Sequence, residues 1–331
     1  MGLVTGLGFA GGHRGQSSGW GRNGWARGMA LLACVLWLAG CTTASVPLGT
    51  KPGTPALVEQ PVFRTSDGTE LAVERWLPAG KPKANILLLH GFNEYTGAFA
   101  GVGQQFAKQG IAVWAFDQRG FGRSPYRGLW SSSGRMAADA REMAVLLRRT
   151  HPHTPLYVLG TSMGGAVALL AAGQRELEVD GLILAAPAVW IRDTQPFYQR
   201  WSLEVAKKFV PGWSPTGEGL GVRPSDNIAM LRRIWKSPWM IRGSRMDTVY
   251  GLVDLMDQAY ATAPGVKVPV LLLYGDKDQL VPKKPTQMLW ARLPKPGKTQ
   301  FIQYPHGWHM LMRDLQGDKV IGDIVRWVGK P

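Results

Sequence analysis

The sequence predicts an α/β domain with a central, mostly parallel sheet flanked by helices and interrupted by an inserted helical cap. Short runs that are apolar throughout recur along the chain, as expected of strands buried on both faces of a parallel sheet. Amphipathic helical patterns separate these runs, which predicts right-handed strand–helix–strand units. A stretch of nearly sixty residues, from about 188 to 246, contains no such strand and divides the alternation in two.

The first two predicted strands form a hairpin. Residues 62–64 and 71–77 flank Ser66-Asp67-Gly68-Thr69, a turn composition between two apolar segments. The buried strands that follow are predicted at residues 86–90, 111–116, 156–159, 182–186 and 268–274, with a last strand near 299–303.

Three helices are predicted beside these strands. Met136, Ala140, Met143 and Leu147 recur at helical spacing after a serine-rich start that supplies a cap. An alanine-rich helix is predicted at 163–173, and the apolar stripe at 318–328 predicts a closing helix. Together these elements predict a core made of residues 61–189 and 247–331.

Residues 190–246 are predicted to form the helical cap. Amphipathic segments at 198–210 and 226–235 are separated by prolines and glycines. Two interpretations of its tryptophans remain open: they pack a small core of the cap, or they line an apolar pocket for an acyl chain, since ligand sites are largely apolar and aromatic. The five tryptophans of this stretch are Trp190, Trp201, Trp213, Trp235 and Trp239.

The N-terminal residues predict an export signal. Residues 29–39, MALLACVLWLA, are apolar throughout but shorter than the roughly 20 residues that span a bilayer. Three arginines and no acidic residue precede them, as in a secretory signal. Leu38-Ala39-Gly40-Cys41 resembles the lipobox of bacterial lipoproteins. The resemblance implies a signal peptide at 1–40 and a lipidated Cys41, with an ordinary cleaved signal as the alternative.

The residues after Cys41 extend this expectation. Residues 41–60 are rich in Thr, Pro, Ala and Gly, a composition typical of a flexible tether. Thr42 stands where an inner-membrane lipoprotein often carries Asp. The resemblance therefore implies an exported protein that is anchored in the membrane through Cys41, in a Gram-negative host at the outer membrane facing the periplasm.

Composition excludes several function classes. Apolar residues make up 45% of the 331-residue chain and charged residues 18%, which is a globular composition. Two cysteines are too few for a disulfide framework or a Cys-rich zinc site. The net charge is +15, from 38 Lys and Arg against 23 Asp and Glu, but no run of five basic residues occurs. Nucleic-acid binding is therefore not expected, and nothing indicates an oligomeric state.

A serine follows one of the predicted strands in a tight turn. Gly160-Thr161-Ser162-Met163-Gly164 lies between the strand at 156–159 and the alanine-rich helix, the context of a nucleophile elbow. Gly160 and Gly164 allow the turn to be tight and the helix to approach the sheet. Ser162 is thereby predicted to stand above the carboxyl edge of the sheet; the alternative is an N-capping serine.

A nucleophilic serine needs a base, and the base needs a carboxylate that orients it. At this kind of turn the chain order is serine, acid, histidine. Asp276 and Asp278 both follow the strand at 268–274, and His306 and His309 both follow the last strand. Spacing alone leaves both choices open.

Three segments carry a family resemblance: HGFNEYTG at 90–97, DQRGFGRS at 117–124 and TSMGG at 161–165. Through them the chain resembles α/β-hydrolases of the monoacylglycerol lipase and lysophospholipase group, which are serine aminopeptidase S33-like hydrolases, from about residue 62 to 328. The first segment resembles the HGxxEHSG loop of the group, with Tyr95 and Thr96 in place of His and Ser. The second resembles its D-x-x-G-x-G-x-S segment, and the third matches its elbow.

The resemblance chooses among the open candidates. The acid of the group ends a G-x-x-D segment, which implies Asp278, and its base stands between an aromatic and an apolar residue, which implies His309. The backbone N–H groups of Phe92 and Met163 are implied to form the oxyanion hole.

The remaining candidates receive structural roles. Asp276 is expected to cap its loop, and His306 is expected to be an ordinary loop residue. Asp117 is expected to bind its own loop or Arg119.

The implied reaction is ester hydrolysis through an acyl-enzyme, with no metal or organic cofactor. The tryptophans and the anchor favour a monoacylglycerol or a lysophospholipid. A broad short-chain esterase, an aminopeptidase-like amidase and a non-catalytic lipid-binding lipoprotein are the alternatives. Residues 190–250 hold ten Lys and Arg against five Asp and Glu. This basic cap fits an anionic membrane surface and disfavours an aminopeptidase, whose cap would need acidic residues for the substrate ammonium.

Overall fold

The computed structural model describes residues 43–58, 61–219 and 221–330. The predicted signal peptide at 1–40 and the predicted lipidation site Cys41 lie outside these residues. Among the described residues, no helix is both long enough and apolar enough to cross a membrane.

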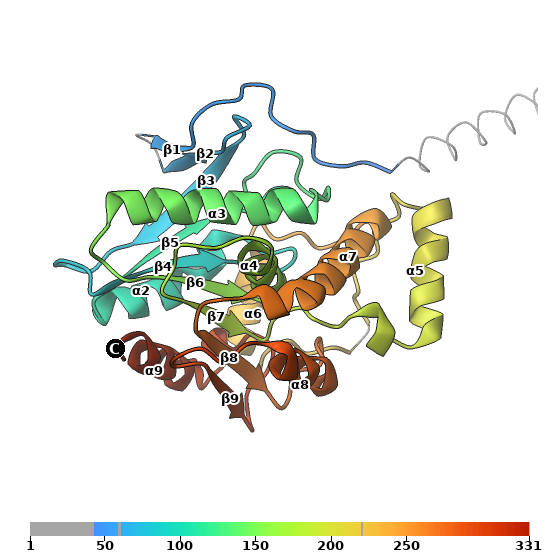
Figure 1. Ribbon diagram of the computed structural model, residues 1–331. Coiled ribbons are helices and arrows are strands. Elements are labelled where there is room, and N and C mark those ends of the chain that lie inside the picture. The colour runs from blue at the N-terminus through green and yellow to red at the C-terminus, as the bar shows by residue number, and fades with distance from the viewer. Residues whose placement is uncertain (1–42, 59–60, 220, 331) are drawn as a thin grey trace, which may run out of the picture. The chain divides into compact units, whose positions relative to one another are not determined.

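A nine-stranded sheet forms the centre of the domain (Figure 1), in the order β1-β2-β3-β5-β4-β6-β7-β8-β9. Strands β1 to β3 pair antiparallel, β3 pairs antiparallel with β5, and the six strands from β5 to β9 in this order run parallel. The strands are β1 Ala56–Val58, β2 Val62–Arg64, β3 Glu70–Trp76, β4 Ala84–Leu89, β5 Ile111–Phe116, β6 Leu156–Thr161, β7 Gly181–Ala185, β8 Val270–Gly275 and β9 Gln300–Tyr304. The predicted fold class, an α/β-hydrolase fold with a mostly parallel sheet between helices, is confirmed.

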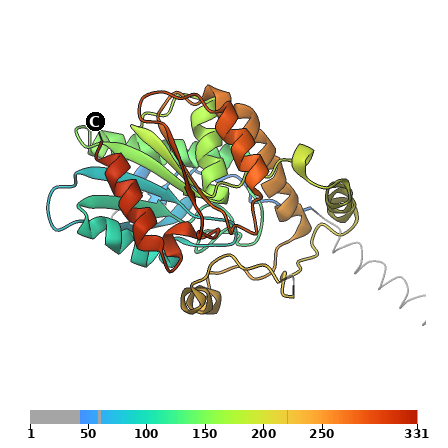
Figure 2. The ribbon, with the colours of Figure 1, turned by 90° about the horizontal axis from the view of Figure 1, so that it is seen from below.

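Helices cover both faces of the sheet (Figures 1 and 2). One face packs against α3, α4, α7 and α8, and the other packs against α2 and α9. The helices are α2 Ala100–Lys108, α3 Ser133–Thr150, α4 Met163–Gln174, α5 Phe197–Phe209, α6 Ile228–Lys236, α7 Met246–Thr262, α8 Lys283–Arg292 and α9 Gly317–Val328. The predicted helices correspond to α3, α4, α5, α6 and α9, whereas α2, α7 and α8 were not predicted.

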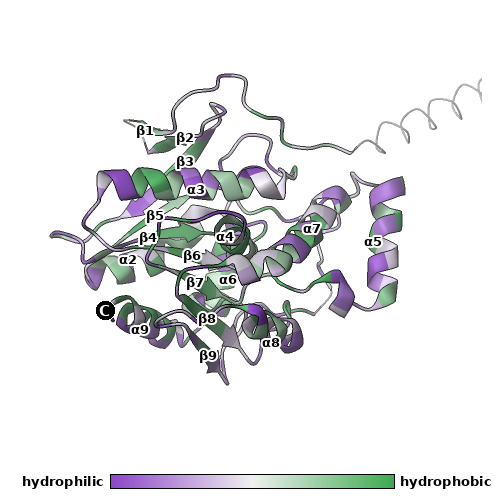
Figure 3. Cartoon of the chain, in the orientation of Figure 1, coloured by the Kyte–Doolittle hydropathy of each residue, from purple (hydrophilic) through white to green (hydrophobic). Residues whose placement is uncertain are grey.

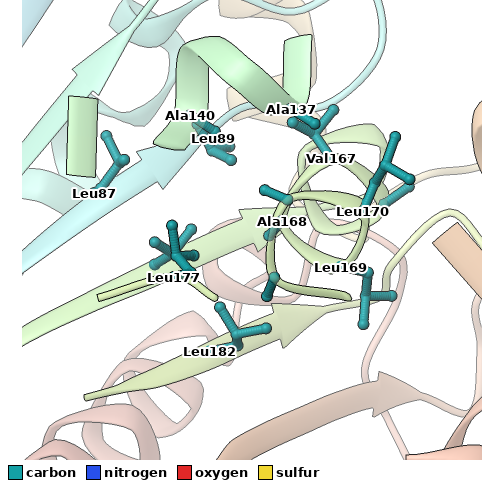
Figure 4. Close-up of a cluster of buried hydrophobic side chains, with 14 of the residues drawn as sticks. Leu87, Leu89, Ala137, Ala140, Val167, Ala168, Leu169, Leu170, Leu177 and Leu182 are labelled. Carbon is teal, nitrogen blue, oxygen red and sulfur yellow. The ribbon is translucent and has the colours of Figure 1, made fainter. Parts of the chain in front are cut away.

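The two apolar cores follow from the side-chain alternation of the strands. In β4, Leu87 and Leu89 face α3 and α4, while Ile86 and Leu88 face α2 and α9. All six residues of β4 are buried, which explains why the strand is apolar throughout rather than alternating. Figure 4 shows part of the first core, in which Leu87 and Leu89 of β4 belong to the same buried cluster as Val167 and Ala168 of α4.

The helices are amphipathic where one side meets solvent (Figure 3). In α9, Val320, Ile321 and Ile324 are buried against the sheet, while Asp318 and Lys319 are exposed. Helix α4 differs because ten of its twelve residues are buried. A helix that is covered on nearly all sides has no polar face, and this accounts for the alanine-rich sequence at 163–173.

Residues between β7 and β8 form an insertion that contains α5, α6 and α7. Helix α6 buries Met230 and Ile234, whereas α5 buries none of its residues. In Figures 1 and 2, α5 stands at the outer side of α7, away from the sheet. The predicted cap at 190–246 therefore contains one helix that packs inward and one that is largely open to solvent.

The described part of the predicted tether differs from the expectation. In residues 43–58, the Val46 N–H donates to the Trp130 carbonyl at 2.9 Å, and the Gly53 N–H donates to the Ser66 carbonyl at 2.9 Å. Ala56–Val58 form β1, which pairs with β2. The prediction of a flexible tether over 41–60 is therefore wrong for these residues, because backbone pairing with the domain fixes a segment whose composition by itself indicates flexibility.

Candidate active site

Ser162 occupies a strained turn between β6 and α4. Its φ of +49° and ψ of −118° lie in a region that residues with a side chain rarely adopt, which costs of order 1–3 kcal/mol. Two hydrogen bonds hold this turn: the Ser162 N–H donates to the Ala185 carbonyl at 3.1 Å, and the Ala188 N–H donates to the Ser162 carbonyl at 2.9 Å. The serine side chain makes no capping hydrogen bond to α4, so the N-cap interpretation has no support in the geometry.

The glycines around Ser162 are required by close approach of the backbone. A Cβ added to Gly160 would lie 2.3 Å from the Gly164 carbonyl oxygen, and one added to Gly164 would lie 2.1 Å from the Leu89 carbonyl oxygen. Real Cβ atoms do not come that close to a carbonyl. The two glycines therefore let α4 start directly against β4 and β6, which keeps Ser162 at the carboxyl edge of the sheet.

Asp278 and His309 meet at the same edge, at the ends of β8 and β9. His309 Nδ1 donates to Asp278 Oδ2 at 2.7 Å. The other carboxylate oxygen, Asp278 Oδ1, accepts from the N–H groups of Leu280 and Val281 at 2.8 and 2.9 Å. The Asp278 side chain is fully buried. Both carboxylate oxygens are thus fixed, and a proton on Nδ1 leaves His309 Nε2 able to accept one.

The competing aspartate and histidine lie apart from this pair. Asp276 binds Lys283 at 2.8 Å at the surface, and His306 is exposed in the turn after β9. The expected loop-capping role of Asp276 is wrong, because Asp278 itself caps the loop through its second oxygen. His306 is a loop residue, as expected.

Ser162 and His309 line one cavity of about 380 Å³. The insertion supplies an apolar part of the lining, with Trp235, Met240 and Ile241 from the cap and Leu252 and Met256 from α7. A hydroxyl and an imidazole that is held by a carboxylate thus open into the same apolar space. This combination can deprotonate the hydroxyl and form a covalent acyl intermediate.

The loop after β4 presents Phe92 to this cavity. Its conformation is held by buried His90, whose Nδ1 donates to the Gly91 carbonyl at 2.8 Å and whose Nε2 accepts from the Gln118 N–H at 2.9 Å. Burial lowers the pKa of His90, which keeps the ring neutral and able to make both bonds. Within the described residues, the backbone N–H groups of Phe92 and Met163 have no acceptor, so both remain available to an oxyanion.

An ion pair that the sequence did not indicate lines the same cavity. Arg313 lies 2.6 Å from Glu94, and both side chains are almost fully buried. Glu94 also accepts from the Gly91 N–H at 3.1 Å, and the Arg313 guanidinium lies 4.1 Å from the centre of the Phe99 ring. Glu94 stood in the predicted loop motif, but no local pattern could pair it with a residue so far along the chain. The pair makes one part of the cavity polar.

Asp117 binds its own loop. It accepts from the Thr96 N–H at 2.7 Å and from Arg123 Nε at 2.8 Å. Burial alone would raise the pKa of Asp117, but the hydrogen bonds from Thr96 and Arg123 lower it overall. The alternative expectation, that Asp117 binds Arg119, is wrong because Arg119 binds Asp67 and Asp139 instead.

The five tryptophans of the cap lie in different environments. Trp235 lines the cavity. Three others are exposed, with 68% of Trp201, 60% of Trp213 and 40% of Trp239 accessible. Neither a tryptophan core of the cap nor a pocket lined by all five therefore describes this region. In the described part of the chain, no group of three or more His, Cys, Asp or Glu side chains is arranged to hold a metal ion.

Comparison with known proteins identifies related chains. Residues 80–316 match the family described as serine aminopeptidase, S33. The chain is 25% identical to a monoacylglycerol lipase of Mycolicibacterium smegmatis over 269 residues, which cover 80% of this chain and 95% of that protein. It is 26% identical to the human monoglyceride lipase over 281 residues, covering 82% of this chain and 90% of the relative.

Solved structures show the same fold. A soluble variant of the monoglyceride lipase of Saccharomyces cerevisiae, solved with a substrate analogue, superimposes with a TM-score of 0.69 over 86% of this chain and 98% of that chain, at 19% identity. The monoacylglycerol lipase of Paleococcus ferrophilus superimposes with a TM-score of 0.64 over 78% of this chain and 98% of that chain, at 23% identity.

Proposed function

The chain belongs to the serine aminopeptidase S33 family and is an α/β hydrolase of the monoacylglycerol lipase group, and from this premise we propose that it hydrolyses carboxylic esters of amphiphilic lipids through Ser162, Asp278 and His309. One observation carries the proposal: Ser162 and the hydrogen-bonded pair His309–Asp278 adjoin one apolar cavity.

The reaction follows from this arrangement. His309 Nε2 takes the proton of the Ser162 hydroxyl as Oγ attacks the ester carbonyl carbon, and Asp278 stabilises the imidazolium that forms. The N–H groups of Phe92 and Met163 stabilise the oxyanion. His309 then gives the proton to the leaving alcohol. A water molecule, deprotonated by the same imidazole, hydrolyses the acyl-enzyme and releases the acid.

The cavity supports an amphiphilic substrate. Trp235, Ile241 and Met256 supply an apolar wall that fits an acyl chain, and the Glu94–Arg313 pair supplies a polar part that fits the hydroxyl groups of a glycerol-containing alcohol. The relatives named above are monoacylglycerol lipases. A monoacylglycerol or a lysophospholipid therefore fits the site better than a small apolar ester.

A fluorophosphonate probe tests the serine assignment. We expect one covalent adduct, at Ser162, located by peptide mass spectrometry and absent from Ser162→Ala. An unlabelled wild-type protein would favour the alternative of a non-catalytic lipid-binding protein.

A panel of monoacylglycerols, lysophospholipids, short-chain esters and aminoacyl amides then ranks the ester and amide alternatives by kcat/KM. A higher kcat/KM on short esters or on amides would contradict the lipid assignment.

We also propose that the protein is exported and lipidated at Cys41, which holds it at its membrane. The lipobox-like Leu38-Ala39-Gly40-Cys41 supports the anchor. The exposed residues Phe197 and Trp201 of α5, with the basic Lys207 and Lys208, support contact with an anionic lipid surface. Intact-mass analysis of the native protein tests the anchor: a mature chain that starts at acylated Cys41 is expected, and any other mature N-terminus would contradict it.

Attachment gives a second test of the anchor. Two or more acyl chains hold a protein stably, whereas one chain is marginal. Cys41→Ser is therefore expected to move the protein out of the membrane fraction while it still hydrolyses dispersed esters. In a Gram-negative host, fractionation is expected to place the wild-type protein at the outer membrane, facing the periplasm.

A further inference from the structure

A basic groove adjoins the catalytic cavity. It has a volume of about 790 Å³ and is formed by the loop around Gly128 and by the segment that follows α6. Met240, Ile241 and Arg242 line both the groove and the cavity. No acidic side chain among the described residues lines the groove. Its charged lining residues are Arg127, Lys236, Arg242 and Arg245.

Three of these cations are not neutralised. Arg245 is paired with Asp247 at 2.6 Å. Arg127 donates to the Pro238 carbonyl at 2.7 Å, and Arg242 donates to the Trp235 carbonyl at 3.1 Å, so their hydrogen bonds position them without cancelling their charge. Lys236 has no acceptor in the part of the chain that the structure describes. Like charges that share a groove repel one another, and an anion bound among them removes this repulsion.

We propose that this groove binds the phosphate headgroup of an anionic lysophospholipid whose ester lies at Ser162. The inference rests on the proposed esterase function and narrows its substrate class. A phosphate offers several charged acceptor oxygens, which match guanidinium and ammonium donors. The glycerol of a monoacylglycerol carries no charge and would leave Arg127, Lys236 and Arg242 uncompensated. The adjoining apolar cavity takes the acyl chain of the same molecule.

Paired substrates test the headgroup. The ratio of kcat/KM for oleoyl-lysophosphatidic acid to kcat/KM for 1-oleoylglycerol is measured in the wild type, Lys236→Gln and Arg127→Gln. We expect each substitution to lower this ratio about three- to ten-fold, because the KM of the anionic substrate rises. A loss of this size is typical when one partner of a partly exposed charge contact is removed. Lys236→Arg is expected to restore the ratio, and 0.5 M NaCl is expected to lower the wild-type ratio.

A matched control separates the groove from net charge. Lys319→Gln removes another exposed cation, from α9 on another part of the domain, and we expect it to leave the ratio unchanged. An equal fall of the ratio in Lys319→Gln would show that total charge attracts the substrate, which overturns the proposal. Unchanged ratios in both groove variants would also overturn it.

A binding experiment that needs no turnover distinguishes failure of this proposal from failure of the proposed function. Calorimetric titration of Ser162→Ala with sn-glycerol 3-phosphate, inorganic phosphate and glycerol is expected to show binding of the two phosphates alone, weakened by Lys236→Gln. If the wild type cleaves no ester but this pattern holds, the esterase function fails and the phosphate site remains. If phosphate binds but the kcat/KM ratio is the same in the groove variants as in the wild type, the groove binds free phosphate and the headgroup proposal is overturned.

Discussion

The sheet side and the cap side of the catalytic cavity are built in different ways. On the sheet side, Ser162, Asp278 and His309 follow β6, β8 and β9, and hydrogen bonds to backbone or side chain hold each of them. On the cap side, the lining residues Trp235, Met240 and Ile241 are only partly buried. In the proposed reaction, the sheet supports the groups that must keep a fixed geometry, and the cap supports groups that meet the substrate.

This difference assigns separate tasks to the two sides. Proton transfer loses efficiency when donor and acceptor shift by fractions of an ångström, so it needs the close-packed, backbone-paired surroundings of the sheet. Binding of an acyl chain depends on the apolar area that is covered and tolerates small movements. We therefore expect substitutions on the sheet side to change kcat for all esters and those on the cap side to change the preference among esters.

The largest effect is expected at the serine. Ser162→Ala removes the attacking hydroxyl and should lower kcat by about four to six orders of magnitude for every ester, as for other triad nucleophiles. Steady-state hydrolysis of short and long esters measures the change. A variant that lost activity only on long-chain esters would contradict the division between the two sides.

A nearly equal loss is expected at the base. His309→Ala removes the acceptor of the Ser162 proton and should lower kcat about as much as Ser162→Ala. His306→Ala, three residues earlier in an exposed turn, is the matched control and should retain most activity. If the two variants exchanged phenotypes, the base would be His306.

The next largest loss of kcat is expected at the acid. Asp278→Asn removes the negative charge that fixes the imidazole tautomer and should lower kcat by about four orders of magnitude. Asp276→Asn breaks only a surface contact with Lys283 and should have a mild effect, since exposed ion pairs contribute little. Circular dichroism checks that both variants are folded. Equal losses in the two would contradict the assignment.

A smaller and selective effect is expected on the cap side. Trp235→Ala removes part of the apolar wall of the cavity and should lower kcat/KM more for long-chain than for short-chain esters, by about 0.8 kcal/mol for each CH₂ no longer buried. Trp239→Ala, an exposed tryptophan outside the cavity, is the control. A uniform loss across chain lengths in Trp235→Ala would indicate damage to cap packing instead.

The smallest effect concerns the stability of the loop that carries Phe92. Burial lowers the pKa of His90 from its ordinary 6.5, so below about pH 6.5 the unfolded chain binds a proton that the folded chain does not. The free energy of unfolding should then decrease as the pH falls, by at most about 1.4 kcal/mol per pH unit. Urea unfolding at several pH values between 7.5 and 5 should show a shallower decrease in His90→Asn; equal slopes would contradict this role of His90.

Much of the candidate site could be proposed from the sequence because its signals are local. A strand that is apolar throughout, the turn Gly160-Thr161-Ser162-Met163-Gly164 and an alanine-rich helix follow one another directly. Family resemblance, and not spacing, favoured Asp278 over Asp276. In the folded chain, Asp276 and Asp278 differ in burial and in their partners. Their positions two residues apart in the sequence do not reveal this difference.

The sequence by itself determined the α/β class, the order of the strands along the chain and the position of the serine turn, because buried strands and tight glycine turns impose residue types at short range. Only the tertiary structure decided which residues from distant segments meet. It placed Arg313 against Glu94, held residues 43–58 on the domain and gathered Arg127 with Lys236 in one groove. Such contacts join segments that are far apart in the chain, and their geometry is set by how the whole sheet and its helices close around the cavity.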